Sequence, residues 1–226
     1  MRIGLVIFDC DGVLVDSEAL SAGVLGQKMA EIGLPITADI FRHDFLGRSF
    51  ASAARRCDER FGRPLPPDFE RSYRQTLFEV LARDLKPMEG VDAVLDGLAV
   101  PFCLATGSQK DRLAVSLKAA GLASRFEGLC FTTSEVAHGK PAPDVFLLAA
   151  ERMGFAPQDC LVLEDSEMGV RAGLAAGMTV WHFAGGAHMK AGYNLPGDVK
   201  PHGRVDSMAE LAVALCARGL CRAAVS

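Results

Sequence analysis

Short, almost continuous apolar runs recur along the chain and are its strongest folding signal. They lie at Arg2–Asp9, Phe102–Thr106, Leu161–Asp165 and Thr179–Phe183, with a weaker run at Leu129–Thr132. A short run without polar alternation is typical of a strand that is buried on both faces, as in a parallel sheet. Helical stretches separate the runs, such as 111–120 and 142–153, and each is followed by a glycine. Strands that alternate with helices predict an α/β fold built on a doubly wound parallel sheet.

Residues 17–84 interrupt this alternation and contain no convincing strand. Apolar side chains recur there at intervals of three and four, which predicts amphipathic helices, and glycine or proline ends each stretch. We therefore expect a small helical domain at 17–84, inserted into an α/β core formed by 1–16 and 85–226. The aromatic residues at these spacings are expected to form the core of the inserted domain: Phe50, Phe61, Phe69 and Tyr73.

Charge and hydropathy exclude several classes of partner. The 226 residues carry 24 Lys and Arg against 28 Asp and Glu, and half of them are apolar, which indicates a folded globular chain. Mild acidity disfavours nucleic acid, because phosphate backbones attract clustered positive charge. No stretch approaches the ~18 apolar residues of a membrane span, and Asp9 and Asp11 cut the first run too short for a signal peptide. We expect a cytoplasmic monomer with no nucleic-acid or membrane partner.

Cysteines and histidines show no clustered site. The seven cysteines are scattered without a C-x-x-C pair, so we expect small buried hydrophobic residues rather than a disulfide framework or a zinc site. His182 and His188 lie six residues apart, which is no helical ligand spacing. Both are expected to be packed in the core or exposed to solvent.

Acidic residues follow two of the apolar runs. Asp9 and Asp11 end the first, and Glu164 and Asp165 end a later one. The carboxyl ends of parallel strands meet at one edge of a sheet, where ligands bind. Carboxylates gathered there repel each other, and Mg²⁺ is the oxygen-seeking cation that suits such a sparse site. No G-x-G-x-x-G and no P-loop follows any strand, so neither a dinucleotide nor a Walker-type nucleotide site is supported.

Four motifs in order carry a family resemblance. They read DCDGVLVDSE at 9–18, LATGS at 104–108, GKPAPDVF at 139–146 and LEDS at 163–166. Together they resemble the haloacid dehalogenase-like hydrolases, over residues 3–183. The insertion at 17–84 resembles the helical cap of the β-phosphoglucomutase-like branch. The resemblance implies a Rossmann-like core and a phosphoric monoester hydrolase.

The resemblance also implies roles for individual residues. Asp9 is expected to be the nucleophile and Asp11 the general acid and base. Mg²⁺ is expected to be held by Asp9, Asp165 and the backbone carbonyl of Asp11, with Glu164 supporting through water. The phosphoryl group is expected to meet four residues: Thr106, Gly107, Ser108 and Lys140.

The best interpretation is a Mg²⁺-dependent phosphatase that hydrolyses a small metabolite, a sugar or sugar-acid phosphate, through an aspartyl-phosphate. A hexose-phosphate mutase and a non-catalytic regulatory homologue are the alternatives. Asp11 argues against a haloacid dehalogenase, which lacks this second aspartate. Lys28, on an expected helix, is a poor candidate for the Schiff-base lysine of a phosphonatase. Ser21 and Phe50 replace the cap histidine and arginine of the branch's mutases.

Substrate identity depends on the cap. Arg48 is the best candidate for a second anionic group of the substrate, because 47–49 sits where this branch has its substrate-facing loop; Arg55 and Arg56 are the other candidates. The substrate, the oligomeric state and the role of the loop 184–201 are left open by the sequence.

Overall fold

The structure, a computed structural model, describes residues 2–45, 50–190 and 194–222. Six strands form one parallel sheet in the order β3-β2-β1-β4-β5-β6. The strands are β1 (Leu5–Phe8), β2 (Phe102–Thr106), β3 (Cys130–Thr132), β4 (Cys160–Glu164), β5 (Thr179–Phe183) and β6 (Gly203–Val205). The predicted α/β fold with a doubly wound, Rossmann-like sheet is confirmed. The strand order reverses at β1, so a crevice opens at the carboxyl ends of β1 and its neighbours β2 and β4.

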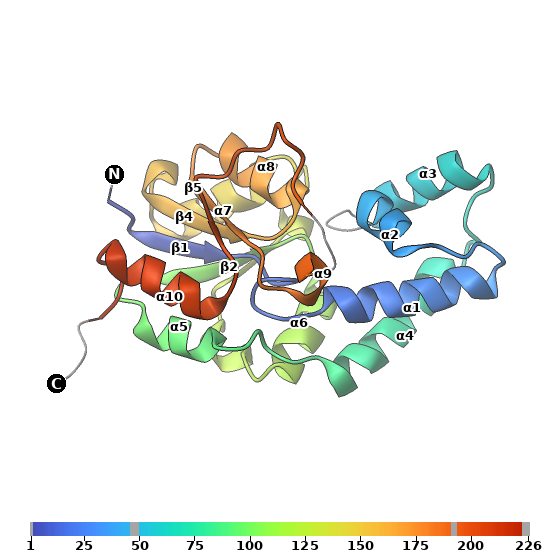
Figure 1. Cartoon of the computed structure of the whole chain (residues 1–226), viewed down its shortest axis with the longest axis horizontal. Helices are drawn as coiled ribbons and strands as arrows, with labels where there is room; N and C mark the ends of the chain where they lie inside the picture. Colours follow the sequence, from blue (N-terminus) through green and yellow to red (C-terminus); the bar gives the residue numbers. More distant parts are fainter. Residues whose placement is uncertain (1, 46–49, 191–193, 223–226) are drawn as a thin grey trace.

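Helices cover both faces of the sheet. Alternate residues of β1 enter two apolar cores, with Leu5 and Ile7 in one and Val6 and Phe8 in the other. The first core is closed by α7 (Asp144–Met153) and α8 (Glu167–Ala175), and the second by α5 (Val91–Gly97), α6 (Lys110–Ala119) and α10 (Met208–Ala217), as Figure 1 shows. The sequences of the strands are therefore unbroken apolar runs, because helices cover both faces of the sheet.

Four helices lie between β1 and α5 in the described part of the chain. They are α1 (Glu18–Glu31), α2 (Ala38–Asp44), α3 (Phe50–Phe61) and α4 (Phe69–Asp84). A separate apolar cluster joins them, and α2 and α3 lie to one side of the sheet in Figure 1. Helices α1 and α4 also reach the core of the sheet through Val24, Leu77 and Leu81. We propose that these helices form the inserted cap domain, with boundaries at 17 and 84.

Several short elements were not foreseen, β6, α2 and α9 among them. Strand β6 has only three residues, one of them glycine, and no apolar run marks it. Helix α2 begins at the N-cap Thr37, whose hydroxyl accepts a hydrogen bond from the Ile40 N–H. Helix α9 (Ala187–Lys190) is a single turn within the loop that follows β5. Elements this short carry too few residues for a period to be recognised.

The expectation that all seven cysteines are free is wrong for two of them. Cys216 and Cys221 form a disulfide, with their Cα atoms 4.8 Å apart. The chain turns back after α10 at Gly219, where φ is +71°, and this turn brings Cys221 alongside the end of the helix. The remaining five are free, and four of them are buried. Among the described residues, no helix combines the length and apolar character that a membrane crossing needs.

Candidate active site

A cavity of about 240 Å³ lies between the carboxyl edge of the sheet and the helices α1–α4. Eight of the residues named from the sequence line it: Asp9, Asp11, Thr106, Gly107, Ser108, Lys140, Glu164 and Asp165. Arg48 lies outside the described residues. Arg55 and Arg56 do not line this cavity; Arg56 pairs instead with Asp44, 3.0 Å away. The fold thus brings together every described residue of the predicted site except these two cap arginines.

Lys140 is the cation at the centre of the acidic residues. Its ammonium donates to Asp9 Oδ1 at 2.8 Å, to Glu164 Oε1 at 2.7 Å and to the Ala105 carbonyl at 3.2 Å. Burial disfavours the charged ammonium, yet the two carboxylates raise the pKa of Lys140 above its usual value. Lys140 therefore stays protonated and compensates part of the negative charge.

Three buried carboxylates form one cluster. Oxygen atoms of Asp9, Glu164 and Asp165 lie within 4.8 Å of one another. Burial and the neighbouring acids raise the pKa of Asp9 and of Asp165 well above the usual range, even though Lys140 opposes the shift. When all three carboxylates are ionised, as metal ligation requires, the single ammonium leaves two negative charges at this place. The oxygen donors and the net charge of two negative units fit one divalent metal ion.

Glu164 is fixed by the start of α8. The backbone N–H of Ser166 and its hydroxyl donate to Glu164 Oε2 at 2.8 and 3.0 Å. The same hydroxyl accepts a hydrogen bond from the N–H of Gly169 and caps α8. A Cβ atom at Gly169 would lie 1.6 Å from Glu164 Oε1. The spacing of Gly169 and Gly173 therefore serves close packing of α8 on the sheet, while Gly177, at φ +72°, follows the end of the helix.

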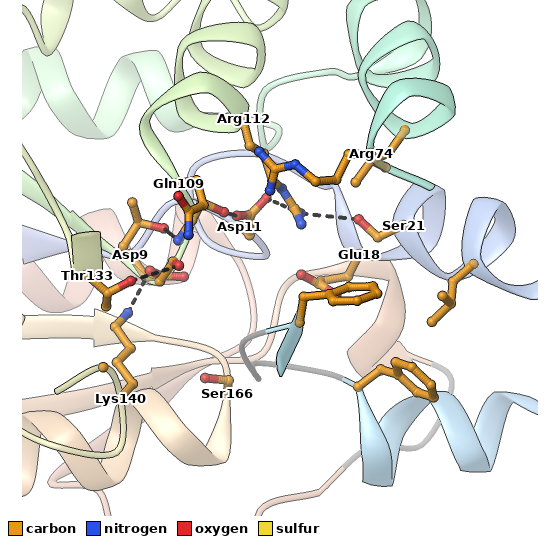
Figure 2. A pocket seen from close by; sticks show the side chains of 18 of the residues that line it. Asp9, Asp11, Glu18, Ser21, Arg74, Gln109, Arg112, Thr133, Lys140 and Ser166 are labelled. Carbon is orange, nitrogen blue, oxygen red and sulfur yellow. Dashed lines mark hydrogen bonds and ion pairs between the residues drawn. The ribbon is translucent and has the colours of Figure 1, made fainter. Parts of the chain in front are cut away.

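Asp11 has different surroundings from Asp9 (Figure 2). It accepts hydrogen bonds from the hydroxyls of Ser17 at 2.5 Å and Ser108 at 2.6 Å, and from Arg112 Nη2 at 2.8 Å. Burial alone would raise the pKa of Asp11, but Arg112 and the two hydroxyls hold it below its usual value. Arg112 also donates to Ser21 Oγ at 3.2 Å, so it links α6 to α1.

The loop after β2 faces the acids across the cavity. Thr106 is buried, and its hydroxyl accepts a hydrogen bond from the Ser108 N–H at 3.0 Å. The Thr133 hydroxyl donates to the Gly107 carbonyl at 3.0 Å. These contacts fix the loop that leads into the first turn of α6. Hydroxyls and backbone N–H groups placed there can bind anionic oxygens.

Sequence reasoning missed Arg112, Glu18 and His188 as residues of this region. Burial, with the charges of Asp11 and Asp165 adding to it, raises the pKa of Glu18 to about 7. His188 lies with its Nε2 atom 2.9 Å from Asp165 Oδ2, and His182 Nε2 lies 3.0 Å from the Asp165 carbonyl. Arg112 had one usable signal, since it stands in the first turn of the helix that follows the Thr106 loop. The histidines had none, because His182 reaches Asp165 from the neighbouring strand β5 and His188 from the helical turn in the loop that follows it.

Comparison with known proteins gives the family. The family described as haloacid dehalogenase-like hydrolase matches residues 3–177. The chain belongs to this family. It is 36% identical over 184 residues to "Probable pseudouridine-5'-phosphatase" of Drosophila melanogaster, covering 77% of this chain and 78% of that protein. It is 26% identical over 190 residues to "6-phosphogluconate phosphatase" of Escherichia coli K12, covering 84% and 86%.

A solved structure supports the same assignment. A haloacid dehalogenase-like protein of unknown function from Agrobacterium tumefaciens superposes with a TM-score of 0.82 at 30% identity, covering 96% of this chain and 99% of that one. Together these matches confirm the haloacid dehalogenase-like family and the enzyme class, a phosphoric monoester hydrolase.

Proposed function

We propose that this chain is a Mg²⁺-dependent phosphatase that hydrolyses a sugar or sugar-acid phosphate through an aspartyl-phosphate on Asp9. The observation that carries the proposal is the position of Asp9 between Lys140 and the acids Glu164 and Asp165 in one cavity. A carboxylate next to a fixed ammonium can approach a phosphate dianion without prohibitive repulsion.

In the first half of the reaction Asp9 attacks phosphorus and the bond to the leaving oxygen breaks. Asp11 gives its proton to that oxygen. The pKa of Asp11 is low in the free protein because Arg112 pairs with it, and the arrival of a phosphate dianion raises it again through like-charge repulsion. Lys140 compensates charge on the phosphoryl group, while Thr106, Gly107 and Ser108 hold its oxygens.

In the second half water attacks the phosphorus of the aspartyl-phosphate. Asp11 takes a proton from that water, and the Asp9 carboxylate leaves with both electrons of the P–O bond. Inorganic phosphate is released, and both aspartates return to their starting state.

Asp9, Asp165 and the backbone carbonyl of Asp11 would hold the Mg²⁺ ion, with Glu164 supporting through water. When bound, the ion supplies positive charge that stabilises the phosphoryl oxygens in the transition state. Removing it with EDTA should abolish hydrolysis of p-nitrophenyl phosphate, and Mg²⁺ should restore it. Ca²⁺ should inhibit, because it prefers more ligands and a looser geometry. Full activity in the chelator would rule out the metal assignment.

Polar groups from both the cap and α6 support a hydroxylated leaving group. Glu18, Ser21 and Arg112 line the cavity beyond Asp11 and offer both donors and acceptors to sugar hydroxyls. The 6-phosphogluconate phosphatase among the relatives agrees with a sugar acid. A panel of phosphorylated metabolites, compared by kcat/KM, tests this part of the proposal separately from the chemistry.

Ser21 and Phe50, at two positions of the cap, distinguish a phosphatase from a mutase. A mutase must keep water from its aspartyl-phosphate until the sugar phosphate has bound again in the opposite orientation. Ser21 here accepts a hydrogen bond from Arg112, and Phe50 stacks on Phe69 and Tyr73, so neither supplies the charged group of a mutase cap. With hexose phosphates and a trace of bisphosphate, we expect inorganic phosphate and no isomeric sugar phosphate. Stoichiometric isomerisation without phosphate release would make the protein a mutase.

A further inference from the structure

The loop that follows β5 turns back over the acidic cluster. Its single helical turn α9 packs against α1, and the Ala187 N–H donates to Asp16 Oδ1 at 3.1 Å. In Figure 1 α9 lies between the sheet and the start of α1. This segment, for which the sequence indicates no role, therefore has a fixed place beside the residues that lead from β1 into the cap.

α9 places a histidine against a carboxylate of that cluster. The His188 side chain is 6% exposed and the Asp165 side chain 3%, and Nε2 and Oδ2 are 2.9 Å apart. A metal ligand must be ionised, and a bare imidazole nitrogen would repel an ionised Asp165 oxygen at this distance, so we expect Nε2 to carry a hydrogen. The two groups are close but imperfectly aligned: among the described residues, neither ring nitrogen of His188 has a partner with good hydrogen-bond geometry.

Two glycines make room for this pair. A Cβ atom at Gly186 would lie 2.6 Å from His188 Cε1, and one at Gly12 would lie 3.0 Å from the same atom and 1.9 Å from Asp165 Oδ2. Any other residue at either position would push the ring or the carboxylate away. The backbone of Asp165 is held separately, because His182 Nε2 contacts its carbonyl. The surroundings of Asp165 thus fix both its main chain and its side chain.

We propose that His188 is a positioning residue of the metal site, which holds the carboxylate of Asp165 in its place beside Asp9. The inference rests on the proposed function, since Asp165 is there a metal ligand. A ligating carboxylate that is free to rotate must be ordered when the ion binds, and a buried imidazole packed against it at 2.9 Å reduces that requirement. Changing such an outer partner typically weakens metal binding or activity by about 10- to 100-fold.

The test measures Mg²⁺ binding directly, by titration calorimetry on the metal-free protein. We expect His188→Ala to raise the Mg²⁺ dissociation constant about 10- to 100-fold. The Mg²⁺ concentration for half-maximal hydrolysis of p-nitrophenyl phosphate should rise by the same factor, while kcat at saturating Mg²⁺ changes by less than about threefold. His188→Gln keeps an N–H donor of similar reach and should recover most of the affinity.

A matched control separates this role from the loss of another histidine near β5. His202 accepts a hydrogen bond from the Val180 N–H near the opposite end of that strand, so His202→Ala should bind Mg²⁺ like the wild type. Unchanged Mg²⁺ affinity in His188→Ala would overturn the inference, as would a loss confined to kcat, or a His188→Gln variant as weak as the alanine. If instead the wild type neither binds Mg²⁺ nor hydrolyses any phosphate ester, the proposed function itself has failed.

A measurement on the wild type keeps the inference testable if His188→Ala does not fold. Nitrogen NMR of the imidazoles reports which ring nitrogen carries hydrogen. His188 should be the Nε2–H form, and its Nε2 signal should shift on addition of Mg²⁺. The Nδ1–H form, with a bare Nε2 facing Asp165, would contradict the proposal.

Discussion

Asp9 and Asp11 lie two residues apart and yet meet opposite electrostatic surroundings. Burial and the acids Glu164 and Asp165 raise the pKa of Asp9, whereas Arg112 and two hydroxyls lower that of Asp11. Pairs of titratable groups whose environments separate their pKa values are typical of acid–base catalysis. In the metal-free protein the contrast runs opposite to the proposed roles, which need Asp9 ionised and Asp11 protonated; bound Mg²⁺ beside Asp9 and a phosphate dianion beside Asp11 would shift the two pKa values toward those roles.

Substitution of each aspartate should therefore have a different signature. Asp9→Asn should remove turnover and the phosphoenzyme together, because an amide is no nucleophile. Asp11→Asn should reduce kcat about 10²- to 10⁴-fold for alkyl phosphates. The loss should be smaller with p-nitrophenyl phosphate, because p-nitrophenol departs with little need of a proton. Steady-state rates on both substrates check this, and equal losses on the two would contradict Asp11 as the general acid.

The Arg112–Asp11 pair should also contribute to stability. Its side chains are only 19% and 13% exposed, and removing one partner of such a pair leaves a charge without compensation. Arg112→Met should lower the free energy of unfolding by about 3 kcal/mol, and the double variant with Asp11→Asn by less than the sum of the single changes. Urea unfolding of the four proteins measures the coupling. Arg83→Met, which removes the exposed pair with Asp84, is the control and should leave unfolding unchanged.

At the scale of elements, the packing of α8 on β4 sets the position of Glu164. Gly169 and Gly173 allow the close approach: Cβ atoms there would lie 1.6 Å from Glu164 Oε1 and 2.8 Å from Val180 Cγ2. The hydrogen bonds of Ser166 then hold the carboxylate toward Lys140. The helix thus does more than cover the sheet, because its first turn holds one wall of the acidic cluster.

Gly169→Ala should therefore damage the site more than an ordinary helix substitution. The added methyl group must displace the Glu164 carboxylate from Lys140, at a cost of about 1–3 kcal/mol in stability and about 10- to 100-fold in activity or Mg²⁺ affinity. Gly23→Ala in α1 is the control: no atom lies within 4 Å of its added Cβ, and it should stabilise by about 0.5–1 kcal/mol. Calorimetric unfolding and kcat/KM are the measurements. Wild-type activity in Gly169→Ala would show that Glu164 tolerates the displacement.

At the scale of the whole molecule, the acidic cluster lowers the stability of the metal-free protein at neutral pH. The folded-state pKa values of Asp9 and Asp165 lie above the unfolded ones. Such groups contribute stability that is fully present below the unfolded pKa, near 3.9, and lost as the pH rises through the raised folded value. Lys140 offsets only part of this loss.

Mg²⁺ should restore the lost stability. The effect should increase with pH, because protons compete with the ion for the same carboxylates. At a hundredfold excess over the dissociation constant the melting temperature should rise by about 5–10 °C. The increment should grow between pH 5 and pH 8. Differential scanning calorimetry with and without Mg²⁺ across that range checks it. An increment that is constant, or largest at low pH, would contradict a site made of buried acids.

The sequence by itself determined five of the six strands and most of the chemistry at the edge of the sheet. Unbroken apolar runs predict doubly covered strands because burial on both faces leaves no place for polar alternation. The acids at the ends of β1 and β4 and the residues of the Thr106 loop follow from those strands, because carboxyl ends of parallel strands share one edge. The role expected of Lys140 came from the family motif, and the structure places its ammonium on Asp9.

The tertiary structure alone decided which further groups meet these residues. Arg112 lies 101 positions from Asp11, and His188 reaches Asp165 through a single helical turn in a loop. Local sequence patterns report how a segment is buried, while contacts between distant segments depend on the path of the chain between them. The same limit applies to Cys216 and Cys221, which a turn at Gly219 brings together. A hydrophobic period cannot encode such a turn, and the contacts that tune Asp11 and Asp165 arise only when the chain folds back on itself.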